Sequence, residues 1–176
     1  MVLSTFNFLP SFKQMKYAIL LMTLVCTVLI VKPIYAQDMI QKTTTFLMFE
    51  GDAEEVITFY TSLFDDSEIV HITKAGPDGP GGPEAEGTVQ HALFTLKGQQ
   101  YMAIDSFGHN FTFTPSISLF VQCDSQEELE TLFKKLSDGG QVMMPIDNYG
   151  FSTRFAWVSD RFGVSWQLNY GNLIFN

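Results

Sequence analysis

The chain has 176 residues and is acidic, with 10 basic and 19 acidic side chains and a net charge of −9 at neutral pH. A surface of this sign repels phosphate backbones, which excludes nucleic acid as a partner. Its 17 phenylalanines and its 46% of hydrophobic residues are enough for one well-packed domain.

The first 36 residues have the layout of a secretory signal peptide. Lys13 and Lys16 precede an uninterrupted apolar run over residues 17–31, and Ala36 provides a small residue for cleavage before Gln37. An apolar helix of this length rises about 22 Å, which is short of the roughly 30 Å hydrocarbon core. Cleavage is therefore favoured, and an uncleaved segment 1–36 that anchors the protein to the membrane is the alternative. We expect residues 37–176 to be periplasmic or secreted, with no membrane contact after cleavage.

Cleavage changes the charge and the cysteine count. Residues 1–36 contain three lysines and no acidic residue, so the remaining chain has 7 basic and 19 acidic side chains and a net charge of −12. Of the two cysteines only Cys123 remains, so no internal disulfide can form even in an oxidising compartment.

The first half of the remaining chain reads as a strand, a helix and three strands. A strand is predicted over 43–49, and Asp52 followed by Glu55 is a capping-box pattern that starts a helix. The spacing of one buried helix face then appears at Val56, Phe59, Tyr60, Leu63 and Phe64. Strands are predicted after the helix at 67–73, 91–96 and 100–105. Residues 75–87, rich in glycine and proline, are predicted to be a flexible loop or a lid over a pocket.

The second half repeats this order. A strand is predicted over 116–121, and Ser125 followed by Glu128 is a second capping box. The helix should bury Leu129, Leu132, Phe133 and Leu136 and end at Gly139-Gly140. Strands are then predicted at 141–145, 153–159 and 164–169.

Apolar and polar residues alternate along the last strand of the second half. The turn from Asp160 to Gly163 precedes it, because Asp accepts backbone N–H groups and Gly tolerates the positive φ of a tight hairpin. Val164, Trp166 and Leu168 should lie on one face, and the polar set Ser165, Gln167 and Asn169 on the other.

Neither half can bury its helix and its sheet face alone, so the two halves should pair. We predict an α+β fold in which two strand–helix–three-strand (βαβββ) modules form one cupped, mostly antiparallel sheet domain over residues 37–176. Module one spans residues 41–108, and module two spans residues 114–172.

This organisation resembles the vicinal-oxygen-chelate superfamily, which includes glyoxalase I, extradiol dioxygenases and fosfomycin-resistance proteins. Within it the chain is most similar to the PhnB-like branch, over roughly residues 41–171. The matching stretches are 49–55 with Phe59-Tyr60, His91-Ala92 with 102–106, 117–121, 147–155 and 160–168. This branch often has the label of a demethylubiquinone methyltransferase, but the sequence lacks a strand-Gly-x-Gly-helix opening for a methyl-donor nucleotide.

The resemblance implies a place for the superfamily's metal. Its metal-binding members use the first and last strands of each module, which correspond here to about Thr44, Ser116, Ala103 and Gln167. Hydroxyl and methyl side chains do not form a transition-metal site, and one neutral Gln is a weak ligand. No metal and no other cofactor are therefore expected. His91 has three interpretations: a hydrogen-bonded core histidine, a contact to a ligand, or a metal ligand.

With no metal site expected, the predicted functional site is a cavity for a small molecule, of the kind that the sheets of this fold enclose. Its predicted lining residues are Phe46, Met48, His91, Tyr149, Arg154, Trp157 and Gln167. Arg154 needs a partner, which is either the internal carboxylate Asp147 or an anionic ligand.

The sequence leaves two functions of different classes open. The first is an exported protein, without a metal centre, that binds a small molecule, which is anionic if Arg154 contacts it. The second is a metal-dependent lyase, isomerase or dioxygenase. Because the positions implied for the metal hold no suitable set of ligands, the first function is favoured. A homodimer is expected because relatives with this fold often pair.

Overall fold

The computed structural model describes residues 43–79, 81–106, 109 and 111–174. The predicted signal segment 1–36 lies outside these residues. No helix in the described part of the chain is long and apolar enough to cross a membrane.

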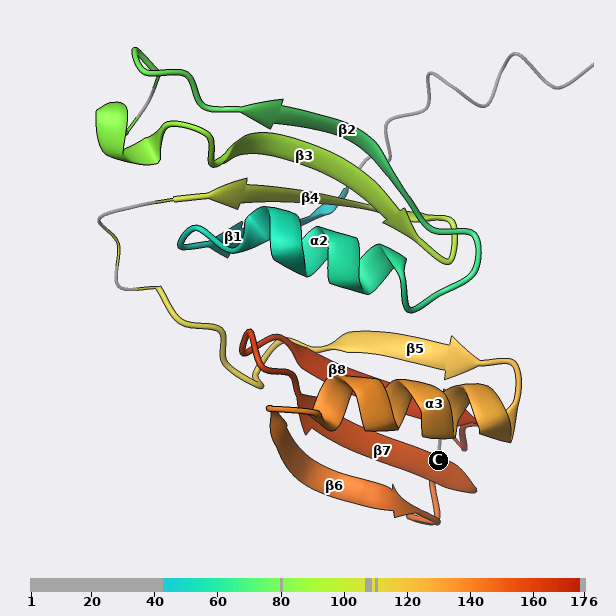
Figure 1. Cartoon of the computed structure of the whole chain (residues 1–176). Helices are drawn as coiled ribbons and strands as arrows, with labels where there is room; N and C mark the ends of the chain where they lie inside the picture. The colour runs from blue at the N-terminus through green and yellow to red at the C-terminus, as the bar shows by residue number, and fades with distance from the viewer. Residues whose placement is uncertain (1–42, 80, 107–108, 110, 175–176) are drawn as a thin grey trace, which may run out of the picture. The chain divides into compact units, whose positions relative to one another are not determined.

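Module one contains one α-helix, one short 3-10 helix and one four-stranded sheet (Figure 1). Its elements are β1 (Thr45–Phe49), α2 (Ala53–Thr61), β2 (Glu68–Lys74), the short 3-10 helix η2 (Pro83–Ala85), β3 (Val89–Leu96) and β4 (Gln99–Asp105). The strand order is β1-β4-β3-β2, in which β1 runs parallel to β4 and the other neighbours are antiparallel.

Module two repeats this arrangement. Its elements are β5 (Leu119–Cys123), α3 (Gln126–Ser137), β6 (Gln141–Asp147), β7 (Arg154–Ser159) and β8 (Ser165–Tyr170). The strand order is β5-β8-β7-β6, and β5 runs parallel to β8. The two βαβββ modules are confirmed. However, they form two separate four-stranded sheets and not one continuous sheet.

Local signals in the sequence explain most element boundaries. Ser125 caps α3 by accepting a hydrogen bond from Glu128 N at 3.0 Å, as the capping box predicts. β5 starts at Leu119 and not at Ser116, because Thr114 to Ile117 forms a turn with Pro115 in its second position and a 3.4 Å bond from Ile117 N to Thr114 O.

The start of α2 is organised by a distant residue. The side chain of Asp52 makes no capping bond, so the predicted capping box with Glu55 is wrong. Asp105, at the end of β4, accepts hydrogen bonds from Gly51 N at 2.8 Å and Ala53 N at 3.0 Å through Oδ1, and from Val89 N at 2.8 Å through Oδ2. One carboxylate therefore joins the start of α2 to two strands.

The predicted helix stripes form the core. Val56, Tyr60, Leu129, Leu132 and Leu136 are at most 1% exposed. Ile57 and Ala53, which the stripe did not include, are also completely buried, so α2 buries a wider face than predicted. Both modules belong to one compact unit that begins at Thr43, and their apolar residues form one cluster.

Asp160 joins the two modules. Its carboxylate is almost completely buried and accepts bonds from Phe162 N (2.9 Å) and Val164 N (3.0 Å), which form the predicted turn. It also accepts the Trp166 indole N–H (2.9 Å) and the hydroxyl of Tyr60 from module one (2.5 Å). Burial, together with the neighbouring carboxylate, raises the pKa of Tyr60. Tyr60 therefore remains a hydrogen-bond donor at neutral pH.

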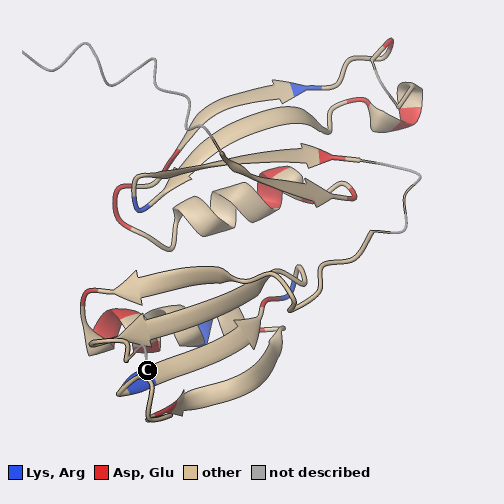
Figure 2. Ribbon diagram, turned by 180° about the vertical axis from the view of Figure 1, so that it is seen from behind, with Lys and Arg blue, Asp and Glu red and all other residues tan. Residues whose placement is uncertain are grey.

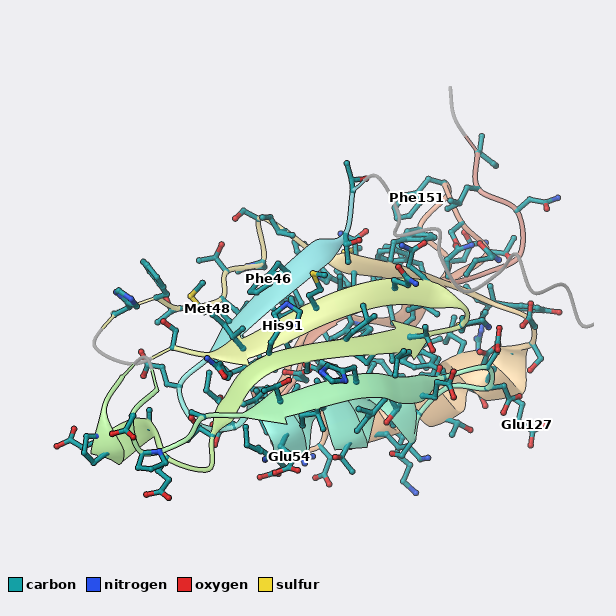
Figure 3. The ribbon with its side chains drawn as sticks, turned by 90° about the horizontal axis from the view of Figure 1, so that it is seen from above. Phe46, Met48, Glu54, His91, Glu127 and Phe151 are labelled. Atoms are coloured by element: carbon teal, nitrogen blue, oxygen red, sulfur yellow. The ribbon has the colours of Figure 1, made fainter. Side chains whose placement is uncertain are left out.

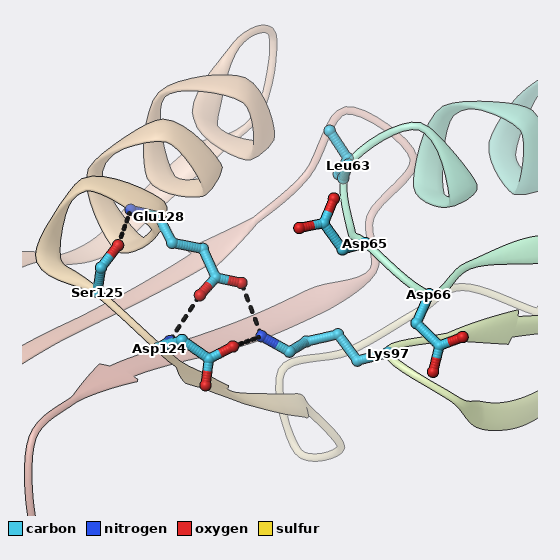
Figure 4. Close-up of a pocket in the computed structure, with 7 residues that line it drawn as sticks. All are labelled: Leu63, Asp65, Asp66, Lys97, Asp124, Ser125 and Glu128. Carbon is cyan, nitrogen blue, oxygen red and sulfur yellow. Dashed lines mark hydrogen bonds and ion pairs between the residues drawn. The ribbon is translucent and has the colours of Figure 1, made fainter. Parts of the chain in front are cut away.

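A second bridge between the modules is ionic. Lys97, in the turn between β3 and β4, donates to Asp124 at 2.9 Å and to Glu128 at 2.8 Å in module two (Figure 4). These groups line a pocket of about 470 Å³ with Asp65 and Asp66. Because the Lys97 ammonium already has two carboxylate partners, this pocket provides no free cation.

Candidate functional site

Each sheet has one face that packs against its helix and one open face. Val164, just before β8, and Trp166 and Leu168 within it are at most 3% exposed and lie on the helix side, while Gln167 and its polar neighbours lie on the other side. This confirms the predicted alternation. In module one, Leu47, Ala92 and Ala103 are buried on the side of α2, so the residues between them form the open face.

The open face of module one is largely apolar. Phe46, Met102, Leu93 and His71 form a row across its four strands. Met48 and His91 lie on the same face, where Figure 3 shows them beside Phe46. The ring of His91 is 6.0 Å from the ring of Phe46, and this imidazole makes no hydrogen bond within the described residues. Three predicted site residues, Phe46, Met48 and His91, are therefore brought together.

The open face of module two has the equivalent row. Phe120, Gln167, Trp157 and Met144 follow one another across β5, β8, β7 and β6. Gln167 thus lies between Phe120 and Trp157, and its amide makes no hydrogen bond within the part of the chain that the structure describes. Phe120 is 46% exposed, which leaves this row open to solvent. Trp157 and Gln167 are brought together as predicted, and Phe120, which the sequence analysis did not include, is a further candidate in this row.

Two hydroxyl groups hold Trp157 in place. Its indole N–H donates to Ser165 Oγ at 2.8 Å, and Ser165 Oγ lies 2.7 Å from Ser118 Oγ. Ser165 is only 2% exposed. These two bonds therefore fix the orientation of the Trp157 ring.

The neighbouring row of module two is closed. Asn169 is completely buried, accepts the Ser152 hydroxyl at 2.5 Å and donates to Gln122 Oε1 at 2.7 Å. Tyr149 and Phe151 pack on Phe155 with ring centroids 6.0 Å and 5.0 Å away. Tyr149, a predicted lining residue, therefore covers part of the face beside the open row and does not lie in the row itself.

Arg154 does not lie on the open face. It has the same strand phase as Ala156 and Val158, which are buried against α3, and its Nη2 donates to Glu130 of that helix at 2.8 Å. Its Nε is buried and has no partner within the described residues. The partner of Arg154 is thus Glu130 and not Asp147, whose side chain accepts the N–H of Asn148.

The positions implied by the superfamily do not fit a metal. Ala103 faces α2, and the register makes Met102 the equivalent of Gln167, so the predicted position was one residue away. Thr44 Oγ1 is buried without a hydrogen-bond partner in the described residues, but a neutral hydroxyl is a poor ligand. The described residues contain no group of three His, Cys, Asp or Glu side chains that could hold a metal ion.

The open rows contain no Asp, Glu, Lys or Arg. Figure 2 shows Asp and Glu mainly on helices, turns and strand ends, whereas the central strands are almost free of charge. Within β5, β7 and β8 the only charged residue is Arg154, which lies on the helix side.

Several pockets border the open faces in the described part of the chain. One, of about 240 Å³, is lined by Phe46 of module one, Ser165 of module two and the linker around Phe113. Another, of about 450 Å³, lies beside the glycine-rich segment, whose ends are joined by a 2.9 Å bond from Ala75 N to Thr88 O. The first pocket contains Phe46 of the row in module one, and a further pocket, of about 310 Å³, contains Phe120 of the row in module two.

Comparison with known proteins agrees with this geometry. A PhnB protein from Bacillus cereus is 57% identical, with a TM-score of 0.70 over 74% of this chain and 100% of that chain. A glyoxylase/bleomycin resistance protein/dioxygenase domain from Frankia is 15% identical, with a TM-score of 0.54 over 76% of this chain and 99% of that domain. Protein YjdN from Escherichia coli is 23% identical over 70% of this chain and 91% of its own length.

The fold is therefore that of the glyoxalase or vicinal-oxygen-chelate superfamily, as the resemblance implied. Within it, the chain belongs to the PhnB-like family described as 3-demethylubiquinone-9 3-methyltransferase, whose model matches residues 41–169. The start of α2 offers nothing to a methyl-donor nucleotide, because the N–H groups of Gly51 and Ala53 are bound by Asp105. We derive no methyl transfer from this site.

Proposed function

We propose that this chain is an exported protein that binds a small, uncharged molecule on the open face of module two without a metal centre. The observation that supports this most directly is the amide of Gln167, which has no hydrogen-bond partner in the described residues and lies between Phe120 and Trp157. An aromatic surface with a few polar groups is the usual composition of a small-molecule site.

A neutral ligand fits this face better than an anionic one. The anionic hypothesis depended on Arg154, but the guanidinium lies on the helix side of β7 and is paired with Glu130. A ligand on the open face would therefore meet hydroxyl, amide and aromatic groups and no fixed positive charge. An anion would also approach an acidic chain, whose net charge is −9 with residues 1–36 and −12 without them.

A screen by nuclear magnetic resonance tests the proposal. Uncharged fragments added to ¹⁵N-labelled protein should shift the indole N–H signal of Trp157 and the side-chain amide signals of Gln167. The indole of Trp166, which is 1% exposed and bound to Asp160, serves as the internal control. A fragment library that leaves the Trp157 and Gln167 signals unmoved would contradict the proposed site.

The alternative function is a metal-dependent lyase, isomerase or dioxygenase. The superfamily fold supports this alternative, but the side chains at the positions implied for the metal do not. Metal analysis of purified protein separates the two. We expect less than one equivalent of transition metal per chain after dialysis, and an unchanged melting temperature in EDTA. One zinc, nickel or iron per chain that is lost in His91→Ala would favour the enzyme.

Export and dimerisation are parts of the same proposal that need their own measurements. Mass spectrometry of protein from the native host should find an N-terminus near Gln37, and an intact Met1 in a soluble fraction would contradict export. Exposed apolar side chains such as Phe46 (45%) and Val70 (49%) favour a homodimer. Light scattering should then give twice the mass of one chain.

A further inference from the structure

The two modules present equivalent rows with different chemistry. In module one the row begins Phe46, Met102, Leu93, and in module two it begins Phe120, Gln167, Trp157. The first position is Phe in both rows. The second changes from a thioether to a carboxamide, and the third from an aliphatic side chain to an indole. Module two therefore combines a hydrogen-bonding group with an aromatic ring on each side of it.

A Gln carboxamide has a donor and an acceptor side by side in one plane. It can therefore form two parallel hydrogen bonds with a molecule that presents a neighbouring acceptor and donor, as the edge of a cis amide does. The same side chain reads the edge of adenine in this bidentate way when proteins bind DNA. Gln167 can offer both groups, because neither is used within the described residues.

The neighbours of Gln167 favour a flat ligand. Phe120 and Trp157 are its direct cross-strand partners, so their rings flank the amide on the same face. Aromatic rings prefer offset-stacked or edge-to-face contact with another π-system. The bond from the Trp157 indole to Ser165, at 2.8 Å, fixes one of these rings in advance, which lowers the entropic cost of binding.

We infer that module two recognises a planar, uncharged ring that carries an adjacent N–H donor and C=O acceptor, as in a lactam-type heterocycle. This inference rests on the proposed function and specifies its ligand class. Gln167 binds the lactam edge, and Phe120 and Trp157 contact the faces or rim of the ring. Module one lacks both the amide and the indole, so it does not bind this class.

Three related probes test the inference on the full chain, in which the predicted signal segment is retained. 2-Pyridone has the planar ring and the lactam edge, N-methyl-2-pyridone has the ring with its donor blocked, and 2-piperidone has the edge without the aromatic ring. The ¹⁵N signals followed during titration should give an affinity for 2-pyridone at least about fivefold higher than for either analogue. N-methyl-2-pyridone loses one of the two hydrogen bonds to Gln167, and 2-piperidone loses the stacking contact.

A variant with its own control strengthens the test. Gln167→Met places the residue of module one at the equivalent position, and it should reduce the affinity for 2-pyridone about fivefold while leaving N-methyl-2-pyridone unchanged. Gln141→Met, on the exposed edge strand of the same sheet, should change neither affinity. The Trp166 indole signal reports whether each variant is folded, and the comparison of the three probes on the parent protein needs no variant.

The outcomes separate the two proposals. Equal affinities for the three probes, with Trp157 and Gln167 signals shifting, would overturn the lactam class and leave a small-molecule site on module two. No shift of these signals with the probes or with the wider fragment library would overturn both. Selective binding of 2-pyridone that Gln167→Met weakens about fivefold would support both.

Discussion

Replacing Tyr60 by Phe tests how the two modules are held together. The substitution removes one hydroxyl group and keeps the ring, which packs edge-on to Trp166 at 4.9 Å. The carboxylate of Asp160 then loses one of its four donors, at a site where Asp160 is only 4% exposed and water cannot easily replace the bond.

The expected cost follows from the charge of the acceptor. A hydrogen bond to an ionised group contributes about 1.5–3 kcal/mol, and burial places this bond in the upper part of that range. We therefore expect Tyr60→Phe to lower the free energy of unfolding by about 2–3 kcal/mol. With a urea dependence of about 1–3 kcal/mol per molar, the midpoint should fall by about 1 M or more.

The chain contains a matched control. The hydroxyl of Tyr149 donates to a neutral backbone oxygen, Pro145 O at 2.9 Å, at an exposed position. Tyr149→Phe should therefore cost about 1 kcal/mol or less. Urea unfolding followed by the fluorescence of both tryptophans measures the two variants in parallel. If Tyr60→Phe costs no more than Tyr149→Phe, the bond to Asp160 does not stabilise the module interface and the reasoning is wrong.

The remaining predictions concern pH and two packing positions. Because the folded pKa of Tyr60 lies above its ordinary value of 10.0, its contribution is fully present below pH 10 and is lost as pH rises further, by up to about 1.4 kcal/mol per pH unit. Tyr60→Phe should remove this part of the alkaline slope, while the part from Cys123, whose pKa burial raises to about 12, should remain. Gly163→Val should cost about 1–3 kcal/mol in urea unfolding, since φ is 85° at this turn and a β-branched residue resists it; an unchanged midpoint would count against the strain. Leu132→Ala should cost about 2–5 kcal/mol, because the side chain is 1% exposed, and a smaller loss would mean that the core closes around the gap.

Local patterns predicted the features that depend on local physics. The capping box at Ser125, the turn from Asp160 to Gly163 and the alternation of β8 each involve residues close in sequence, and each appears as expected. The helix stripe of α3 also belongs to this group, since Leu129, Leu132 and Leu136 are buried. The repeat of these signals at a constant spacing is what made the two-module fold predictable.

Features that depend on strand phase were harder to predict. β7 reads Arg154-Phe-Ala-Trp-Val-Ser, and both of its alternating sets are apolar, so the sequence does not say which set faces α3. The prediction placed Arg154 with Trp157, whereas their positions three apart put them on opposite faces. The same ambiguity in β4 led to Ala103 in place of Met102. The carboxylate at the start of α2 comes from Asp105, more than fifty residues away, which no local pattern contains.

The repeat itself separates the positions that maintain the fold from those that define the site. Phe46 and Phe120 are equivalent and identical, as expected where the requirement is an aromatic residue on an edge strand. Buried positions such as Ala92 and Ala156 are likewise the same, because both helices need close approach to the sheet. Met102 and Gln167 differ although the fold makes the same demand on both. An unpaired amide on a half-buried face contributes less to packing than Met, and the polar ligand proposed for module two would give this amide a hydrogen-bonding partner.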